Sequence, residues 1–300
     1  MLIVGTGAMA CLMAAGLVSA GHQVTMLGSW KPGLDQLHRH GVRLDNGQAF
    51  PVTVTDRPGD CRGATQVVVV NKAWQTSETA RQLEHILAPE GRVLTLQNGL
   101  GNRELLAQHL GAERVEAGVT TLGATMLEPG KIRPAGQGAI VLPDHSQFHQ
   151  LFSHTGLSLR QESNLDSLVW GKLVINAGIN PVAAIFGLTN GQLLEHPLAN
   201  LWMRAAALEA AEVARAAGVL LPFADPVAAV AQVAQQTARN RASMLVDLER
   251  GTPCEIEAIS GAVVRAGRRF GVATPYNSKL REAVARAAGR EPGRPSLSAS

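Results

Sequence analysis

The sequence predicts an α/β domain built on a parallel sheet, followed by an all-helical domain. Three observations carry this prediction. Short β-branched runs alternate with helical stretches in the first half, a glycine-rich turn follows the first run, and long stretches rich in alanine and leucine fill the second half. The expected boundaries are 1–165 and 166–288, with a disordered tail rich in Pro, Gly and Ser at 289–300.

Each element of the first domain has a local signal. Strands are expected at 2–4, 24–27, 66–70, 92–96 and 115–121. Helices are expected between them at 9–20, 33–40, 76–87 and 102–110, and glycines that would cap helices follow at Gly21, Gly41 and Gly111. Residues 126–142, rich in glycine and proline, predict further strands that close the sheet. Helices of the second domain are expected at 166–186, 198–217, 225–250, 255–270 and 278–288.

The composition excludes several classes of protein. With 46% hydrophobic and 17% charged residues, the chain of 300 residues is too apolar for disorder and can bury a sizeable core. It lacks eighteen consecutive uncharged apolar residues and a signal-peptide pattern, so a soluble, cytoplasmic protein is expected. The three cysteines are odd in number and far apart, which predicts neither disulfides nor a metal site. A net charge of +3, 4% aromatics and no long run of like charges give no sign of nucleic-acid binding.

Lysine is scarce among the 27 basic side chains. Only five are lysine, namely Lys31, Lys72, Lys131, Lys172 and Lys279. Because arginine supplies most of the positive charge that keeps this surface soluble, the position of each lysine is informative.

A glycine-rich turn follows the first expected strand and opens the first expected helix. It reads Gly5, Thr6, Gly7, Ala8, Met9 and Ala10, the G-x-G-x-x-A pattern of Rossmann-type dinucleotide-binding domains. Gly5 permits the tight turn, Gly7 lets the backbone approach a pyrophosphate, and the helix N-terminus supplies unpaired N–H donors. A glycine turn without function is the alternative, but the strand and helix on either side favour dinucleotide binding by residues 5–9.

The end of the second expected strand indicates which dinucleotide is bound. NAD sites usually place an acidic residue there to accept from the ribose 2′-hydroxyl. In this chain no acidic residue precedes Asp35, and the strand is followed by Ser29, Trp30 and Lys31. A hydroxyl, an aromatic face and a cation suit a 2′-phosphate, so NADP is expected; the alternative for Lys31 is an exposed loop lysine.

A polar stripe interrupts the apolar helix expected at 166–186. Lys172, Asn176 and Asn180 are spaced by four residues, so they project from one side of the helix. Burying a lysine is costly unless it is paired or faces a wet cleft. The stripe therefore predicts an active-site face with a lysine proton donor and two orienting amides; the alternative is an ordinary solvent-facing stripe.

Two further polar residues follow buried strands. Lys72 lies just after the strand at 66–70, and Asn98 with Gly99 follows the strand at 92–96. Ligands of open parallel sheets bind at the carboxyl ends of the strands, which favours a functional role for both positions. Strand-end solvation for Lys72 and simple turn formation for Asn98 are the alternatives.

Taken together, these motifs resemble the ketopantoate reductase (2-dehydropantoate 2-reductase) family along nearly the whole chain. In order, the matching segments begin with the glycine-rich turn and continue with Lys72 to Gln75, Gln97 to Gly101, Trp170 to Pro181, Thr189 to Leu193, Asn240, Ser243 with Met244, and Glu255 to Glu257 before Gly261.

The resemblance implies a function and site residues. It implies NADPH-dependent reduction of ketopantoate to pantoate, in which Lys172 protonates the carbonyl oxygen and Glu255 supports the active site. It places Lys72 near the cofactor and substrate. It also implies that polar side chains hold the cofactor amide and the substrate or line the cleft, at Asn98, Asn176, Asn180, Asn190, Asn240 and Ser243. A homodimer formed through the helical domain is expected as in some members.

The chain departs from the family pattern in two places. Ala10 replaces the third glycine, a change that this turn tolerates. Ser29 stands where many members carry an arginine for the 2′-phosphate, so Lys31 or Arg39 would have to take that role. The alternatives to a ketopantoate reductase are a related reductase or dehydrogenase of another 2-keto or β-hydroxy acid, and a non-catalytic NADP-sensing protein.

Overall fold

The computed structural model describes residues 1–136 and 138–289, and its first unit is built on a six-stranded parallel sheet. The strand order is β5 (Thr53–Thr55), β2 (Thr25–Leu27), β1 (Leu2–Val4), β6 (Ala64–Val69), β7 (Leu87–Thr95) and β8 (Val115–Ala117). All five pairings are parallel. This order, with the chain starting in the middle and moving outward in both directions, is that of the Rossmann fold. The predicted fold class is confirmed.

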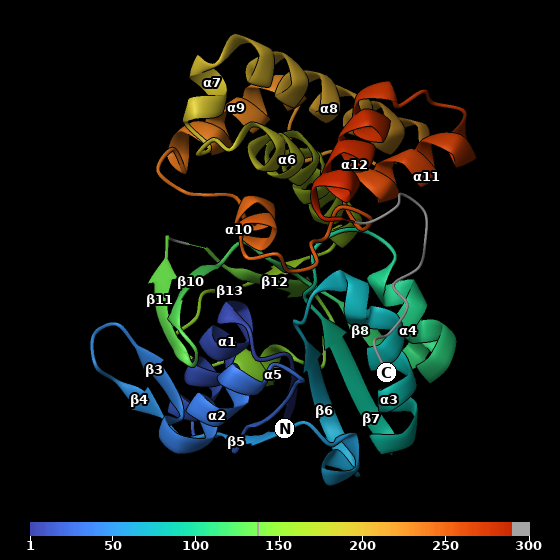
Figure 1. Cartoon of the computed structure of the whole chain (residues 1–300). Coiled ribbons are helices and arrows are strands. Elements are labelled where there is room, and N and C mark those ends of the chain that lie inside the picture. Colours follow the sequence, from blue (N-terminus) through green and yellow to red (C-terminus); the bar gives the residue numbers. More distant parts are fainter. Residues whose placement is uncertain (137, 290–300) are drawn as a thin grey trace. The chain divides into compact units, whose positions relative to one another are not determined.

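Both faces of this sheet are covered by helices. Alternate strand residues point to opposite faces: Ile3 and Val68 join the cluster that contains α1 (Ala8–Ser19), whereas Val67 joins the cluster of α3 (Thr76–Ile86) and α4 (Asn102–Leu110). Figure 1 shows α3 and α4 on one side of the sheet and α1 on the other. Continuous apolar strands are therefore needed, which is why the runs at 2–4 and 66–70 lack polar alternation.

The strands after β8 do not extend the first sheet as predicted. They form a four-stranded sheet of β10 (Gly123–Glu128), β11 (Lys131–Ala135), β3 (Val42–Leu44) and β4 (Ala49–Phe50), and a three-stranded sheet of β13 (Leu159–Glu162), β12 (Ile140–Pro143) and β9 (Val119–Thr120). The single strand predicted at 115–121 is wrong, because β8 and β9 belong to different sheets. Gly118 separates the two strands. A Cβ at this position would lie only 2.7 Å from a side-chain carbon of Leu96, so the close packing here favours glycine. Along the chain, the short helix α5 (His149–Phe152) connects β12 to β13 of the three-stranded sheet.

The second unit is helical and centres on α6 (Leu165–Phe186). Its other helices are α7 (Gln192–Glu195), α8 (Pro197–Ala216), α9 (Pro226–Gln236), α10 (Ser243–Glu249), α11 (Ser260–Phe270) and α12 (Pro275–Ala287). Gly178 lets α6 pack closely, since a Cβ there would lie 2.8 Å from Val230. By its contacts the segment Asn98–Gly101 also belongs to this unit, whereas Met1–Gln97 and Asn102–Leu165 make up the first. By length and composition α6 could cross a membrane, but half of its apolar window is buried inside the protein, as in a core helix.

Two predicted helices are wrong in extent. The helix expected at 225–250 is two helices, because the carbonyls of Ala238 and Asn240 accept the N–H groups of Gly191 and Asn190 instead of continuing the helix. The helix expected at 255–270 begins only at Ser260, so Glu255 lies in the preceding loop. The tail expected at 289–300 lies outside the described residues apart from Gly289.

Candidate active site

The glycine-rich turn has the geometry that a pyrophosphate requires. Gly5 has φ +132°, and a Cβ there would lie 3.1 Å from the backbone nitrogen of Asn71. Gly7 caps α1 without a side-chain hydrogen bond, no acidic residue lies in the first turn, and a Cβ on Gly7 would meet nothing within 4 Å. The helix N-terminus is thus approachable and electropositive, so these residues fit a dinucleotide phosphate.

The end of β2 lies against this turn. A Cβ on Gly28 would come 2.7 Å from the Thr6 side chain, so the two segments are in close contact. Ser29 is exposed, and Lys31 begins α2 (Lys31–His40). Lys31 forms an ion pair with Asp56, which raises the pKa of the lysine and lowers the pKa of the carboxyl.

Asp56 was missed by the sequence reasoning. The prediction of NADP rested on the lack of an acidic residue directly after β2, but Asp56 follows β5, which pairs with β2. Arg39, the other suggested partner of a 2′-phosphate, lies near the opposite end of α2, about 12 Å along the helix from Lys31. There it lines a separate pocket of about 480 Å³ together with Arg43 and Glu128.

The carboxyl ends of β6 and β7 are joined by a network of side-chain hydrogen bonds. The Gln97 amide donates to Asn71 Oδ1 (2.9 Å) and to Thr76 Oγ1 (2.9 Å), and Thr76 Oγ1 donates to Asn102 Oδ1 (2.9 Å). Lys72, partly buried, lies within this edge and precedes the short helix η2 (Ala73–Gln75). Lys72 therefore lies at the predicted edge of the sheet, and the hydrogen-bond network beside it makes this edge rigid. Three members of the network, Asn71, Thr76 and Asn102, were not predicted.

Lys172 occupies the polar stripe of α6. Its neighbours Gly171, Leu173 and Val174 are buried, whereas Lys172 itself is partly exposed. Burial lowers the pKa of its ammonium to about 8, and the negative charge of Glu255 opposes this effect. A lysine with such a pKa can donate a proton near neutral pH.

Asn176 and Asn180 continue the stripe beyond Lys172. Both are partly exposed. Within the described part of the chain, neither side-chain amide is engaged by another residue. A cation and two available amides on one helix side suit a carboxylate or hydroxyl ligand.

Glu255 brings together two segments far apart in the sequence. It is 6% exposed, and its Oε2 accepts a hydrogen bond of 3.1 Å from the Asn98 amide. The N–H of Leu100 donates to the carbonyl of Ala258 at 3.3 Å, so backbone and side chain both hold the 98–101 segment against the Glu255 loop. Asn98, Lys172 and Glu255 are thus parts of one constellation in the helical unit.

The Glu255 loop is held from its other side by Glu257. The carboxylate of Glu257 accepts from Arg281 Nε (2.8 Å), and its backbone carbonyl accepts from Arg265 Nη2 (2.9 Å). Arg281 lies on α12 and Arg265 on α11. Together with the Asn98–Gly101 segment, α11 and α12 therefore anchor the loop at three places in the unit.

The remaining predicted substrate residues lie around the α9–α10 connection. Asn190 is 7% exposed and donates to Thr237 Oγ1 at 2.8 Å, whereas Asn240 and Ser243 are exposed. The backbone N–H of Asn190 also donates to the carbonyl of Asn240 at 3.0 Å. The contacts of Asn190 therefore support the loop that carries Asn240.

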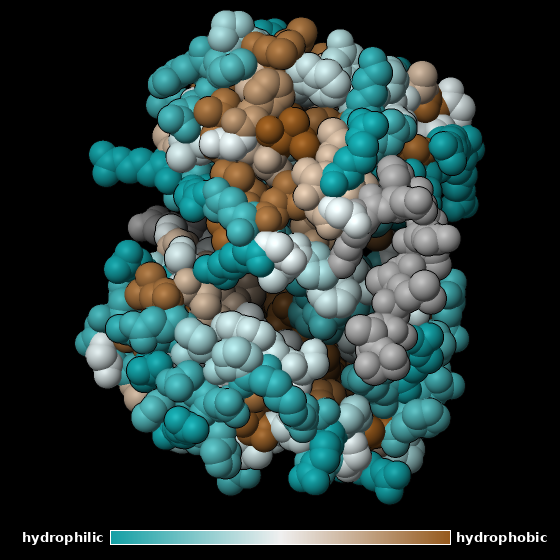
Figure 2. Space-filling view, in the orientation of Figure 1, coloured by the Kyte–Doolittle hydropathy of each residue, from teal (hydrophilic) through white to brown (hydrophobic). Residues whose placement is uncertain are grey.

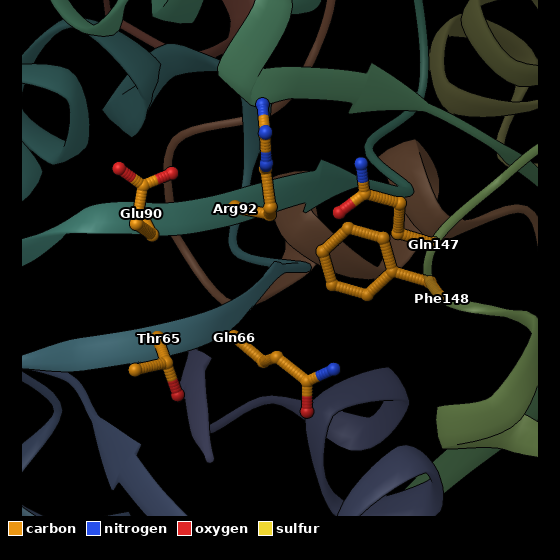
Figure 3. A pocket seen from close by; sticks show the side chains of 6 residues that line it. All are labelled: Thr65, Gln66, Glu90, Arg92, Gln147 and Phe148. Carbon is orange, nitrogen blue, oxygen red and sulfur yellow. The ribbon is translucent and has the colours of Figure 1, made fainter.

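A polar pocket of about 310 Å³ lies away from these residues. It is lined by Thr65, Gln66, Glu90, Arg92, Gln147 and Phe148 (Figure 3). Thr65 and Gln66 stand at the start of β6, so the pocket is at the amino edge of the sheet, opposite the edge where dinucleotides bind. No predicted site residue lines this pocket.

Comparison with known protein families decides the family. The model described as "Ketopantoate reductase PanE/ApbA" matches residues 1–147, and the one described as "Ketopantoate reductase PanE/ApbA C terminal" matches residues 164–288. The chain belongs to the ketopantoate reductase family. The resemblance inferred from the motifs is thereby confirmed.

Individual relatives agree with this assignment. The 2-dehydropantoate 2-reductase of Archaeoglobus fulgidus is 34% identical, with 93% of this chain and 94% of the relative covered, and that of Halobacterium salinarum is 33% identical, with 94% and 97% covered. Among solved structures, a PanE/ApbA family ketopantoate reductase from Ralstonia eutropha has a TM-score of 0.87 at 29% identity, covering 96% of this chain and 99% of that one.

The fold is also shared with an enzyme of another name. D-mandelate dehydrogenase in complex with NADH and anilino(oxo)acetate has a TM-score of 0.86 at 22% identity, with 96% of this chain and 98% of that one covered. At that identity the likeness concerns the fold alone. The reaction class rests instead on the family: as a ketopantoate reductase family member, the chain is an oxidoreductase that uses a nicotinamide dinucleotide.

Proposed function

We propose that this protein is an NADPH-dependent 2-dehydropantoate 2-reductase that reduces ketopantoate to (R)-pantoate in pantothenate biosynthesis, in the cytoplasm, with Lys172 as general acid. The observation that carries the proposal is the placement of Lys172 on the α6 stripe, with a pKa lowered to about 8 and with Glu255 and Asn98 in the same unit. Membership of the family supplies the reaction class.

The reaction needs a positively charged proton donor at the carbonyl oxygen. When bound, the nicotinamide supplies a hydride to the carbonyl carbon. The C=O π bond breaks, and its electron pair remains on the oxygen, which takes a proton from Lys172 Nζ. Lys172 ends the step as a neutral amine, and Glu255 keeps the ammonium form favourable until the proton is needed.

The other predicted residues divide between two tasks. Residues 1–165 would bind the dinucleotide, and residues 166–288 together with Asn98 would bind the substrate. For cofactor binding we propose Gly5, Thr6, Gly7, Ala8, Met9, Ser29, Lys31, Lys72 and Asn98. For substrate binding we propose Asn98, Asn176, Asn180, Asn190, Asn240 and Ser243, whose amides and hydroxyl can hold a carboxylate and a hydroxyl group without competing charge.

The decisive test is an assay of NADPH and NADH oxidation with 2-dehydropantoate. NADPH oxidation should be faster with 2-dehydropantoate than with any other 2-keto acid of a panel. In the oxidative direction, 3-hydroxy acids should reduce NADP⁺ more slowly than pantoate does. A higher kcat/KM for another acid would assign the chain to a related reductase or dehydrogenase. Cofactor binding without oxidation by any keto acid would instead indicate a sensing protein.

The rate of reduction is expected to fall at alkaline pH. Lys172 must be protonated to donate, and its pKa is about 8, so kcat/KM for reduction should decrease by about tenfold per pH unit above that value. For pantoate oxidation the lysine must accept a proton, so that rate should rise through the same pH range. Steady-state pH profiles in both directions check the sign, and a reduction rate that stays level up to pH 10 would contradict it.

We also propose a homodimer formed through the helical unit. Leu198, Leu201 and Leu208 on α8 are between 46% and 53% exposed and lie along one side of the helix. Figure 2 shows apolar residues gathered over the helical unit on the visible face. Exposed apolar patches of this kind mark protein interfaces. Light scattering should give twice the mass of one chain, and Leu201→Glu should give a monomer; a monomeric wild-type protein would contradict the proposal.

A further inference from the structure

Two oppositely charged side chains meet at the ribose end of the dinucleotide site. Thr55 of β5 pairs with Leu27 of β2, and the N–H of Gly28 donates to the carbonyl of Thr55 at 3.1 Å. Asp56 therefore lies level with Gly28, which itself contacts Thr6 of the glycine-rich turn. From the start of α2, Lys31 reaches Asp56 and forms the ion pair.

The pair combines the two kinds of residue by which Rossmann folds distinguish NAD from NADP at the ribose. In Rossmann folds an acidic residue near the end of the second strand accepts from the 2′-hydroxyl of NAD, whereas a cation nearby accommodates the 2′-phosphate of NADP. This chain places one of each at that point. The cation follows β2 in the chain, and the acid follows the neighbouring strand β5.

The ion pair is exposed to solvent, so Lys31 can exchange Asp56 for another anionic partner. The side chain of Lys31 is 73% exposed and that of Asp56 is 37% exposed. Exposed ion pairs contribute little to stability because water screens the charges. A phosphate dianion, which carries more negative charge than a carboxylate, can replace Asp56 as the partner of Lys31.

We propose that Asp56 is a specificity-determining residue that competes with the 2′-phosphate for Lys31 and so reduces the preference of this enzyme for NADPH over NADH. With NADPH, Lys31 exchanges Asp56 for the phosphate, and the carboxylate then stands near a second negative group. With NADH, the pair stays intact and Asp56 is placed to accept from the 2′-hydroxyl. The inference rests on the dinucleotide site of the proposed function.

The test uses two nucleotide fragments that differ only in the 2′-phosphate. Calorimetry would measure the affinities of adenosine 2′,5′-bisphosphate and of 5′-AMP for the full-length wild-type protein, Asp56→Asn and Lys31→Met. We expect Asp56→Asn to raise the affinity ratio of bisphosphate to 5′-AMP by about fivefold, as expected for release of an exposed ion pair. Lys31→Met should lower the ratio, and in the double variant the gain from Asp56→Asn should shrink.

A neighbouring ion pair provides the matched control. Asp60 pairs with Arg57 at 3.2 Å in the same loop, so Asp60→Asn makes the same charge change nearby. That variant should leave the ratio close to the wild-type value. An unchanged ratio in Asp56→Asn, or an equal rise in Asp60→Asn, would overturn the inference.

The outcome is separable from that of the proposed function. Fragment binding involves neither the substrate nor turnover. If the enzyme fails to reduce 2-dehydropantoate but the affinity ratio rises in Asp56→Asn, only the proposed substrate is contradicted. If reduction occurs and the affinity ratio does not change, only the proposed role of Asp56 is contradicted. Thermal melting of each variant shows whether it is folded before binding is compared.

Discussion

Replacing Lys172 with methionine is expected to lower kcat for reduction by about 10²- to 10⁴-fold, the usual contribution of a general acid. Such a loss corresponds to about 3–5 kcal/mol of transition-state stabilisation. Methionine keeps an unbranched chain in a partly buried position on α6, and it removes a charge whose burial is unfavourable. Turnover should therefore be lost without loss of folding, and NADPH affinity should stay nearly unchanged.

The control for this variant is a lysine with no role in the site. Lys279 is exposed on α12 of the same unit, and Lys279→Met should retain wild-type turnover. Stopped-flow measurement of NADPH oxidation, with calorimetric titration of NADPH, separates chemistry from binding. Near-normal turnover in Lys172→Met would remove Lys172 from the mechanism, and weakened NADPH binding with unchanged turnover would make it a cofactor residue.

The sequence could predict features whose signal lies within one segment. The α6 stripe is read from residues four apart on one helix, and the glycine-rich turn from six consecutive residues, so local geometry is enough. The same holds for the central strands, whose apolar runs follow from burial on both faces. Glu255 carries no such signal, because it lies in a loop, and only the family resemblance pointed to it.

Features made by pairing of distant segments could not be predicted. Asp56 reaches Lys31 only because β5 pairs with β2, and sequence patterns do not give strand order. The hydrogen bond from Asn98 to Glu255 spans 157 residues. The break at 237–242 arises because Gly191 and Asn190 occupy backbone carbonyls that would otherwise extend a helix, a tertiary contact that overrides the helical propensity of that stretch.

Gly99 is the position where adding a single methyl group should most disturb the contact between Asn98 and Glu255. It has φ +88°, and a Cβ there would lie 2.2 Å from the carbonyl oxygen of Ala258, a backbone atom that cannot rotate away. Gly99→Ala is expected to lower the free energy of unfolding by about 3 kcal/mol through left-handed strain and overlap together. Relief of the overlap requires Asn98 or Glu255 to move, so kcat/KM should fall as well.

Gly101 separates the effect of backbone strain from the effect of steric overlap with Ala258. It has φ +89°, but a Cβ there would meet nothing within 4 Å, so Gly101→Ala carries the backbone strain without the overlap. We expect it to cost only about 1 kcal/mol and to leave kcat/KM close to wild type. Urea unfolding and steady-state kinetics of both variants make the comparison. Equal effects of the two substitutions would mean that the contact with Ala258 is unimportant. A larger loss in Gly99→Ala, in both stability and kcat/KM, would show that the close backbone approach at Gly99 is what keeps Asn98 on Glu255.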